Sequence, residues 1–384
     1  MNHILKRSLH CSAVSLVAIS AFSPMVALAQ FPVFKQTNLV SNDATANPAQ
    51  VIDPLLKNAW GVSYGPSGPW WISNNGSGTS TLYSTNPSTN ATAKLGLTVT
   101  IPGDGSVTGQ VFNSNTAGTP NFNSNNFLFV SEDGTVSGWR GALGTSAQVL
   151  QTGSASNVYK GSAFATISTH SYLYSANFRA GTIDVLKGDS GAPNLTGSFQ
   201  DSSLPVGYAP FNIQRLGSAL YVTYALQDAA KHDEVDGAGN GYVDSFDLNG
   251  NLIARVGTQG ALNSPWGLAL APTSFGVYSG DLLVGNFGNG TIGAYNLASS
   301  SFDGLLRGLD GNTLTIGGLW ALSVGNNGNA GSSNSLYFTA GPQGESNGLF
   351  GALQAVPEPG QFAYLLTLGV PAIGVILRRR KLKK

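Results

Sequence analysis

The amino-acid sequence predicts an all-β fold, a six-bladed β-propeller. The middle of the chain consists of short apolar runs rich in β-branched and aromatic residues, each followed by Gly, Asn or Asp, and the chain contains 50 Gly. A strand-opening residue pair recurs six times, at intervals of 48 to 55 residues. A further strand-like segment, 34–40, precedes the first repeat. Short strands, glycine-rich turns and a fixed period together indicate a radial array of small sheets.

Each repeat begins with the pair, continues into a second strand and then reaches a glycine-rich turn. The six pairs are Trp60-Gly61, Thr108-Gly109, Ser162-Ala163, Phe211-Asn212, Trp266-Gly267 and Trp320-Ala321. A unit of about 52 residues is long enough for a four-stranded blade. Isolated sheets of this size expose their edges, and a ring of six covers their faces. We expect segment 34–40 to close the ring by pairing with 349–353.

The first 29 residues have the features of a secretory signal peptide. A basic pair at positions 6 and 7 precedes an uncharged apolar run that ends in Ala-Leu-Ala at 27–29. This order matches a basic region, an apolar region and an A-x-A cleavage site. We expect export by the Sec machinery and cleavage between Ala29 and Gln30, with a retained transmembrane anchor as the alternative. The only cysteine, Cys11, lies in this segment, so the mature chain must fold without disulfides.

The C-terminal 29 residues form a second targeting segment. Val356, Pro357, Glu358 and Pro359 precede an uncharged stretch at 361–377, and six Lys or Arg residues follow it. The stretch is slightly shorter than the roughly 20 residues of a stable membrane span, so it suits a transient anchor whose basic tail stays in the cytoplasm. A simple tail anchor is the alternative.

This tripartite end resembles the PEP-CTERM sorting signal of Gram-negative bacteria. The resemblance implies that a membrane transpeptidase, exosortase, acts on an inner-membrane intermediate. It also implies delivery to the cell surface or extracellular matrix, often alongside exopolysaccharide production. The chain would then have three parts, a signal peptide at 1–29, a propeller at 30–355 and a sorting signal at 356–384.

The body of the chain carries a second resemblance. Its stretches Gly207-Tyr208-Ala209-Pro210-Phe211-Asn212, Pro265-Trp266-Gly267-Leu268 and Gly317-Gly318-Leu319-Trp320 resemble an uncharacterised family of secreted six-bladed propellers. That family is similar to the NHL type, and many members carry the same C-terminal tag. The resemblance implies a fold and an extracytoplasmic location, and it implies no established activity.

The charge distribution argues against nucleic acid as a partner. The chain has 19 basic and 19 acidic residues, but eight of the basic residues lie in the two terminal segments. The body keeps 11 basic residues against 18 acidic ones, because Glu358 lies in the C-terminal segment, and this gives it a net charge of about −7. A negative surface disfavours binding to nucleic acid and to anionic lipid.

Two short motifs match hydrolase patterns, and neither predicts catalysis here. The Gly-Asp-Ser-Gly sequence at 188–191 matches the nucleophile loop of trypsin-like proteases, but His170 lies too close to it in the sequence to belong to a second barrel. The Gly-Glu-Ser-Asn-Gly sequence at 344–348 needs a strand-to-helix turn to act as a nucleophile elbow, and it occupies a turn between strands of the repeat. We interpret both as polar turns.

The segment 231–244 is the densest cluster of potential oxygen ligands. Asp233, Glu234, Asp236 and Asp244 are weak candidates for Ca²⁺ or Mg²⁺ ligands, because hard cations prefer several oxygen donors. The spacing does not fit an EF-hand, and a solvated acidic loop is the favoured alternative. The body has only two histidines, His170 and His232, and no cysteine, which excludes a three-histidine or cysteine-based centre. A lactonase-like site would draw on Glu132, Asp133, Asp236 or Asn177.

Four aromatic residues recur at the start of the predicted innermost strands, namely Trp60, Phe211, Trp266 and Trp320. The repeat should bring them together near one mouth of the central channel, where their rings could stack on a sugar. Packing between blades is the favoured alternative.

We therefore predict a non-enzymatic binding or structural propeller with a polysaccharide or matrix-protein partner, and we assign no catalytic residue. A metal-dependent hydrolase or lyase acting at the channel mouth is the competing hypothesis. A scaffold that only packs with its neighbours is the third.

Overall fold

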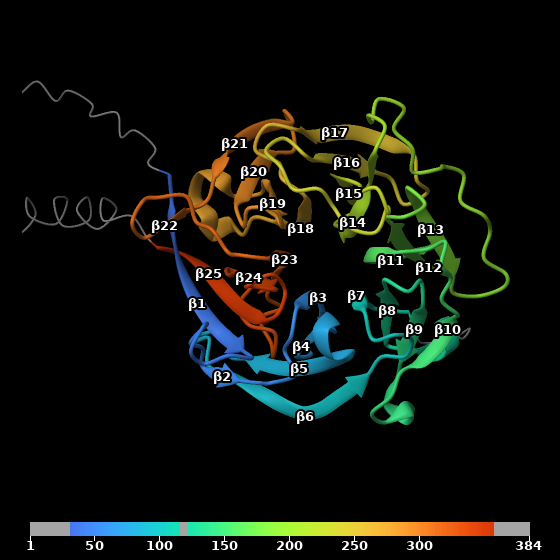
Figure 1. Cartoon of the computed structure of the whole chain (residues 1–384), viewed down its shortest axis with the longest axis horizontal. Helices are drawn as coiled ribbons and strands as arrows, with labels where there is room; N and C mark the ends of the chain where they lie inside the picture. The colour runs from blue at the N-terminus through green and yellow to red at the C-terminus, as the bar shows by residue number, and fades with distance from the viewer. Residues whose placement is uncertain (1–30, 116–120, 357–384) are drawn as a thin grey trace, which may run out of the picture. The chain divides into compact units, whose positions relative to one another are not determined.

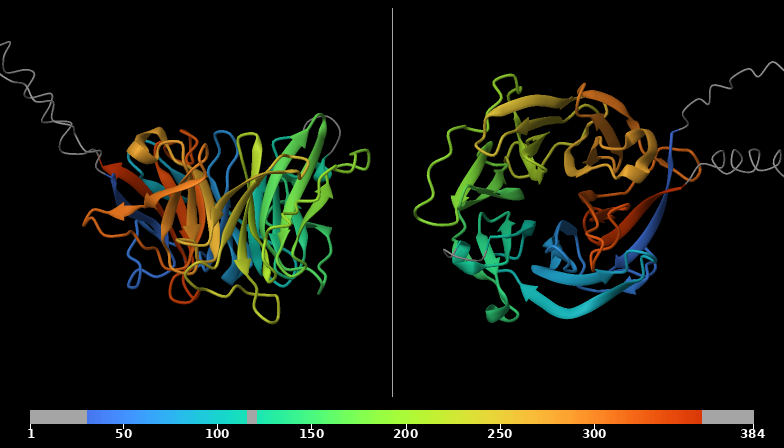
Figure 2. Two further views of the ribbon diagram at one scale, coloured as in Figure 1. Left: turned by 90° about the horizontal axis from the view of Figure 1, so that it is seen from above. Right: turned by 180° about the vertical axis from the view of Figure 1, so that it is seen from behind.

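The computed structural model describes residues 31–115 and 121–356, and in these residues the strands form six sheets around a common axis (Figure 1). Figure 2 shows the same sheets standing side by side as the blades of a ring. The helices among the described residues are four short 3₁₀ turns, η1 (Asn75–Ser77), η2 (Phe122–Ser124), η3 (Gly141–Leu143) and η4 (Thr273–Tyr278). The prediction of an all-β, six-bladed propeller is confirmed.

The first five blades are built from consecutive strands, whose order in each sheet follows their order in the chain. Blade 1 contains β3 (Ala59–Ser63), β4 (Trp70–Asn74), β5 (Thr79–Thr85) and β6 (Thr92–Thr100). Blade 2 contains β7 (Val107–Phe112), β8 (Phe127–Ser131), β9 (Val136–Trp139) and β10 (Gln148–Gln151). Blade 3 contains three strands, β11 (Tyr159–Ile167), β12 (His170–Asn177) and β13 (Thr182–Lys187). Blade 4 contains β14 (Tyr208–Leu216), β15 (Ala219–Leu226), β16 (Tyr242–Phe246) and β17 (Leu252–Thr258). Blade 5 contains β18 (Pro265–Leu270), β19 (Leu282–Asn286), β20 (Ile292–Asn296) and β21 (Ser301–Leu305).

The sixth blade joins the two ends of the described chain. It contains β23 (Leu319–Val324), β24 (Leu336–Ala340) and β25 (Leu349–Val356), and β1 (Val33–Ser41) pairs antiparallel with β25. The pairing runs from Val33 opposite Val356 to Ser41 opposite Leu349. The short strands β2 (Val51–Ile52) and β22 (Arg307–Gly308) add to the outer side of β1. The predicted closure of the ring by the N-terminal strand is confirmed.

The first strand of each blade lies nearest the axis. These strands contact one another all the way around, in the order β3, β7, β11, β14, β18, β23 and back to β3. Each pairs with the second strand of its blade through a register shift near its start, a β-bulge that bends the strand. The first unpaired residues of the six shifts are Trp60, Thr108, Lys160, Phe211, Trp266 and Trp320.

In blade 3 the predicted pair is wrong by two residues. The register shift of β11 falls at Lys160, so Lys160-Gly161, not Ser162-Ala163, is equivalent to the pairs of the other blades. A Cβ built on Gly161 would lie 2.8 Å from the Cα of Asn212 in the next blade. The absence of a side chain at Gly161 is what lets β11 approach β14 so closely.

Apolar clusters fill the spaces between neighbouring blades. One cluster joins blades 3 and 4 and includes Ala165, Tyr174, Ile213 and Val222, all fully buried. Burial of apolar surface stabilises the fold by about 25 cal/mol per Å². Contacts of this kind recur between the other blades, so the ring is held by side chains as well as by the β1–β25 closure.

The two predicted targeting segments lie outside the described residues, apart from Val356 at the end of β25. Within residues 31–115 and 121–356, no helix combines the length and the hydropathy needed to cross a bilayer.

Candidate functional site

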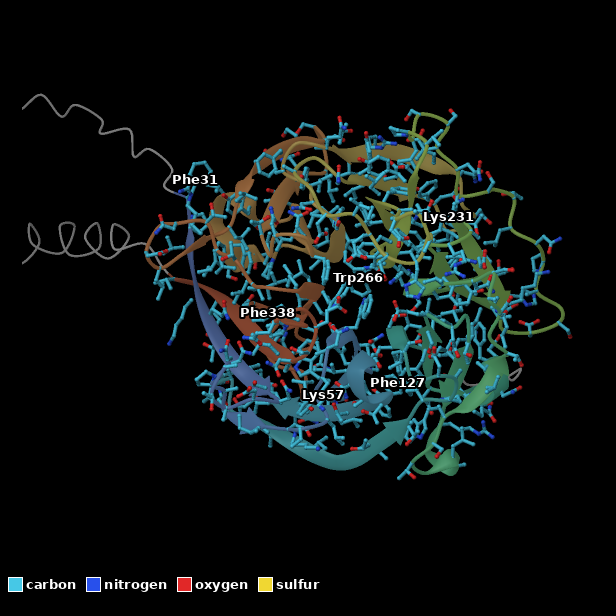
Figure 3. The ribbon with its side chains drawn as sticks, viewed as in Figure 1. Phe31, Lys57, Phe127, Lys231, Trp266 and Phe338 are labelled. Carbon is cyan, nitrogen blue, oxygen red and sulfur yellow. The ribbon has the colours of Figure 1, made fainter. Side chains whose placement is uncertain are left out.

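The four aromatic residues predicted to meet near the axis do lie together. Trp320 stacks on Trp60 with ring centroids 3.6 Å apart and on Phe287 at 4.0 Å. Trp266 packs edge-on against Trp320 with ring centroids 6.0 Å apart. The ring of Phe211 packs at an angle against Trp320, with centroids 5.9 Å apart. Figure 3 labels Trp266 near the middle of the ring. At most 4% of each of the four predicted residues is exposed, so they fill the centre of the channel, and stacking of a ligand on them stays a prediction.

Lys160 occupies in blade 3 the position that an aromatic residue holds in four other blades. Its side chain is 2% exposed, and its Nζ lies 2.5 Å from Oε1 of Glu132 and 3.1 Å from Oδ1 of Asp233. Nζ also lies 5.3 Å from the ring centre of Trp60. Burial of an unpaired ammonium is strongly unfavourable, and the carboxylates and the indole face offset that cost.

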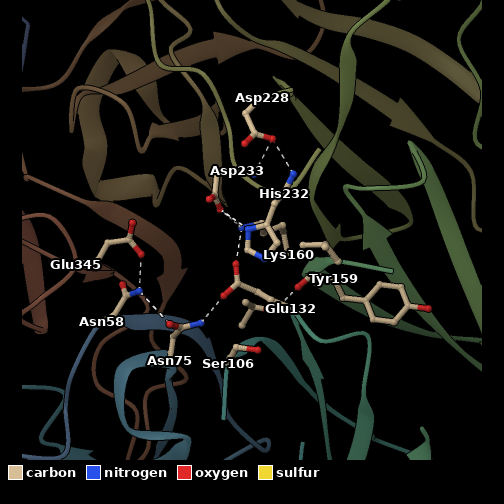
Figure 4. Close-up of polar contacts among 12 residues, drawn as sticks. Asn58, Asn75, Ser106, Glu132, Tyr159, Lys160, Asp228, His232, Asp233 and Glu345 are labelled. Carbon is tan, nitrogen blue, oxygen red and sulfur yellow. Dashed lines mark hydrogen bonds and ion pairs between the residues drawn. The ribbon is translucent and has the colours of Figure 1, made fainter. Parts of the chain in front are cut away.

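The carboxylates near Lys160 come from three different blades. Glu132 follows β8, Asp233 and Glu234 lie between β15 and β16, and Glu345 lies between β24 and β25. Each of these loops follows the second strand of its blade, so the loops gather at one end of the ring (Figure 4). We call this end, with Glu132, Lys160, His232, Asp233, Glu234 and Glu345, the acidic end.

Hydrogen bonds from amides connect the acidic end to the aromatic cluster. Trp320 Nε1 donates to Oδ1 of Asn58 at 2.8 Å, and Asn58 Nδ2 donates to Oε2 of Glu345 at 2.6 Å. Asn75 Nδ2 donates to Oε2 of Glu132 at 3.0 Å. Asn58 has a φ of 45°, a left-handed conformation that Asn adopts more readily than most residues. Asn58, before β3, thus presents its amide to the loop of Glu345, and Asn75, after β4, presents its amide to the loop of Glu132.

The loop between β15 and β16 is fixed by its own polar contacts. The backbone N–H of His232 donates to Oδ1 of Asp228 at 2.8 Å. Nδ1 of His232 lies 2.8 Å from Oδ1 of Asp233, the same oxygen that receives Lys160. His232 therefore shares a carboxylate with the buried ammonium.

The electrostatic environment raises some pKa values at the acidic end and lowers others. Burial lowers the pKa of Lys160, but Glu132, Glu234 and Asp233 outweigh burial and leave that pKa above its ordinary value. Burial raises the pKa of Glu234 to about 7, against the attraction of Lys160, and burial also raises the pKa of Glu345. Burial also tends to raise the pKa of Asp233, but Lys160 and His232 outweigh burial and hold that pKa below its ordinary value. Near neutral pH, Lys160 is charged and Glu234 is partly protonated.

The acidic end encloses a cavity of about 360 Å³, lined by its six residues together with Trp60 and Trp320. Glu132 and His232 also line a larger groove of about 780 Å³ that runs over the ends of blades 2 and 3. Small polar residues line much of that groove, among them Ser106, Thr135, Thr152, Ser154 and Asn157. The cavity and the groove therefore lie side by side and share Glu132 and His232.

The structure separates the predicted metal ligands. Asp233 and Glu234 lie at the acidic end, and Asp236 lies close to Gly288 in blade 5. Asp244 is fully buried in β16, where it binds the guanidinium of Arg255, so it belongs to a different cluster. Ligand atoms of Glu132, His232 and Asp233 lie within 4.8 Å of one another. Because Lys160 already contacts two of these three, the donor set does not fit a metal ion while Lys160 stays in place.

The opposite end of the channel has a different character. A cavity of about 330 Å³ there is lined by residues from all six innermost strands, including Gln110, Asn212 and Trp266. Arg215 supplies the only formal charge among its lining residues. The aromatic cluster lies between this cavity and the acidic one, since Trp266 lines the first while Trp60 and Trp320 line the second.

Both hydrolase-like motifs form turns. Gly188–Gly191 follows β13, where Asp189 pairs with His170 at 3.0 Å. Ser346 lies between two strands, and its Oγ donates to the carbonyl of Gln343 at 2.7 Å. The interpretation of 344–348 as a turn between strands is confirmed, but its Glu345 belongs to the acidic end, which the sequence did not indicate.

No protein-family model matches the chain. An uncharacterized protein of Acanthamoeba polyphaga mimivirus is 29% identical over 357 residues, which cover 87% of this chain and 83% of that protein. A streptogramin B lyase structure superposes with a TM-score of 0.45 and 10% identity, covering 84% of this chain and 97% of that one. The virginiamycin B lyase of Staphylococcus aureus gives a TM-score of 0.43 and 10% identity, covering 84% and 99%. At these values neither likeness carries an argument about activity.

Proposed function

We propose that the chain is an exported propeller that binds a hydroxyl-rich polymer of the cell surface or extracellular matrix through its acidic end. The observation that carries the proposal is the cavity around Lys160, two of whose lining residues, Glu132 and His232, also line the neighbouring groove. A cavity beside a groove suits one unit of a polymer and its neighbours. Carboxylates, hydroxyls and amides are the groups that hydrogen-bond sugar hydroxyls.

Binding is favoured over catalysis because three of the four carboxylates of the site, Glu132, Asp233 and Glu345, already accept hydrogen bonds from neighbouring side chains. Glu132 accepts hydrogen bonds from both Lys160 and Asn75, and Glu345 accepts one from Asn58. Carboxylates held in this way orient a ligand well, and they are less available as nucleophiles or general bases.

The binding proposal is tested with the purified protein on a glycan array and in pull-downs with isolated matrix polymer. The double variant Asp233→Asn/Glu345→Gln is expected to lose most of the retained polymer. The control Asp310→Asn, an exposed carboxylate beside β22, is expected to bind like the unmodified protein. The proposal fails if the unmodified protein retains neither glycans nor polymer.

The sorting signal supports the location in this proposal. The Pro-Glu-Pro motif, the apolar stretch and the basic tail are expected to hold the chain at the inner membrane until exosortase releases it. Replacing Pro357, Glu358 and Pro359 by Ala should shift the protein from the cell surface and medium to the membrane fraction. Unchanged secretion of this variant would contradict the proposed sorting.

A metal-dependent hydrolase or lyase is the second candidate, favoured by the approach of Glu132, His232 and Asp233. It requires that Ca²⁺ or Mg²⁺ displace Lys160 from two carboxylates. It predicts a stoichiometric ion in the purified protein and a lower Tm in chelator. Metal analysis without an ion, and melting unchanged by chelator, would exclude it.

A further inference from the structure

We infer that the cavity at the acidic end binds the ammonium group of an amino sugar, an inference that rests on the proposed binding of a polymer at this site. Four carboxyl groups line the cavity, from Glu132, Asp233, Glu234 and Glu345, and Glu234 is partly protonated near neutral pH. The ammonium of Lys160 and the imidazole of His232 face them. Lys160 compensates Glu132 and part of Asp233. The Asp233 side chain is 63% exposed, so it faces an incoming ligand with negative charge to spare.

Lys160 illustrates how the cavity accepts an ammonium ion. Its Nζ lies between carboxylate oxygens and over the face of Trp60. Carboxylates combined with an indole face favour an organic cation, because the ring quadrupole adds to the ion pairs. Trp320 lines the same cavity and offers a second aromatic wall.

Trp60 provides independent evidence for a ligand that also carries oxygen atoms. Trp60 lines the cavity and is 2% exposed, and its indole Nε1 has no hydrogen-bond partner among the described residues. An indole N–H only donates, so its partner must be an acceptor such as a hydroxyl or a ring oxygen. A bare metal ion or an alkylammonium ion supplies no such acceptor. An amino sugar carries its ammonium beside hydroxyl groups.

The dimensions also fit. A volume of about 360 Å³ lies at the lower end of the range for small-molecule sites and holds a single sugar unit. The neighbouring groove, with its hydroxyl and amide side chains, continues from Glu132 and His232 and accommodates the adjoining units of a chain.

The test compares three β-1,4-linked tetrasaccharides by calorimetry at about 0.15 M salt, where long-range attraction is screened. One is a chitin tetramer with a single free amine, one is fully acetylated, and one is cellotetraose. The amine-bearing tetramer is expected to bind at least about tenfold more tightly, a difference of about 1.4 kcal/mol. Asp233→Asn, at a side chain that is 63% exposed, keeps an oxygen that can accept a hydrogen bond from Lys160 and is expected to remove most of this preference, whereas Asp310→Asn keeps it.

Trp60→Phe keeps an aromatic ring and removes the N–H donor. It is expected to weaken binding of the amine-bearing tetramer several-fold. Because the smaller ring packs less well against Trp320, its Tm should also fall, and binding is measured well below that Tm. Equal affinity for all three tetramers would overturn the ammonium inference and leave the polymer proposal standing. Absence of binding by all three, together with failed polymer pull-downs, would overturn both. A lysine peptide that binds as tightly as the amino tetramer would overturn the assignment to a sugar.

Discussion

Lys160 is the residue on which the charge balance of the acidic end depends. It is nearly fully buried and contacts Glu132 and Asp233. Replacing it by Met should destabilise the fold by about 3–5 kcal/mol, because removal of one partner leaves buried negative charge uncompensated. Urea unfolding measures the loss. The exposed Lys231→Met, in the adjacent loop, should change stability by less than about 0.5 kcal/mol. Equal effects of the two substitutions would contradict the assigned role of Lys160.

Glu234 should make stability depend on pH. Its pKa is about 7 in the folded protein against an ordinary 4.5, so folding favours its protonated form. That stabilisation is complete below about pH 4.5 and is lost as pH rises through 7, and its size is about 3 kcal/mol. As pH rises from about 4.5 to above 7, the free energy of unfolding should therefore fall less for Glu234→Gln than for the unmodified protein. Unfolding midpoints measured across this interval test the difference, with the exposed Val235→Ala as the control. If the unfolding midpoints of Glu234→Gln and the unmodified protein change in parallel with pH, Glu234 is not the source of the pH dependence.

The sequence predicted the aromatic members of the central ring and missed Lys160. Trp60, Phe211, Trp266 and Trp320 were recognisable because large rings recur at one period. Lys160 was missed because Ser162 opens a more apolar run, although Lys160-Gly161 divides the distance between Thr108 and Phe211 more evenly. The role of Glu345 depends on contacts with loops of other blades, which no local pattern reveals.

At the scale of single strands, the bulge in each innermost strand sets the spacing between blades. A Cβ on Gly61 would lie 2.5 Å from the carbonyl oxygen of Thr108 and 2.9 Å from the backbone N of Gln110, both in β7. Gly61→Ala should therefore force two backbones apart and cost about 1–3 kcal/mol. Gly96→Ala in β6 is the matched control, since its Cβ would meet nothing within 4 Å. The unfolding midpoint in urea should fall only for Gly61→Ala, and equal midpoints would count against close packing as the reason for Gly61.

The strands themselves were predictable because alternating apolar runs and turn residues are local signals. The bulges were not, because each reflects the register between two strands and the approach of a third. The position of the β15–β16 loop was also beyond local prediction. Its acidic residues suggested a solvated loop, and the packing of blade 4 against blade 3 is what places Asp233 beside Lys160.

At the scale of the whole molecule, the pairing of β1 with β25 seals the ring. Lys35 lies opposite Gln354 in this pair, and both side chains reach solvent. The double variant Lys35→Cys/Gln354→Cys should form a disulfide that raises stability by about 2–4 kcal/mol, because it joins the two ends of the folded chain. The gain should vanish on reduction.

The control for this cross-link is Gln36→Cys/Gln354→Cys, whose side chains point to opposite faces of the sheet. It should not form the intramolecular disulfide, and its Tm should be the same with and without reductant. Cross-linking of the control pair to the same extent would show that the register of the closing strands differs from that described.

The aromatic cluster at the axis determines whether a molecule can pass through the central channel. The channel is blocked by a cluster of buried aromatic side chains, those of Trp60, Trp266, Trp320 and Phe211. Solutes and ions therefore cannot pass through the ring along its axis. A compound that enters the negatively charged mouth must leave by the same route. The acidic cavity and the cavity beside Arg215 are therefore reached from opposite ends of the ring.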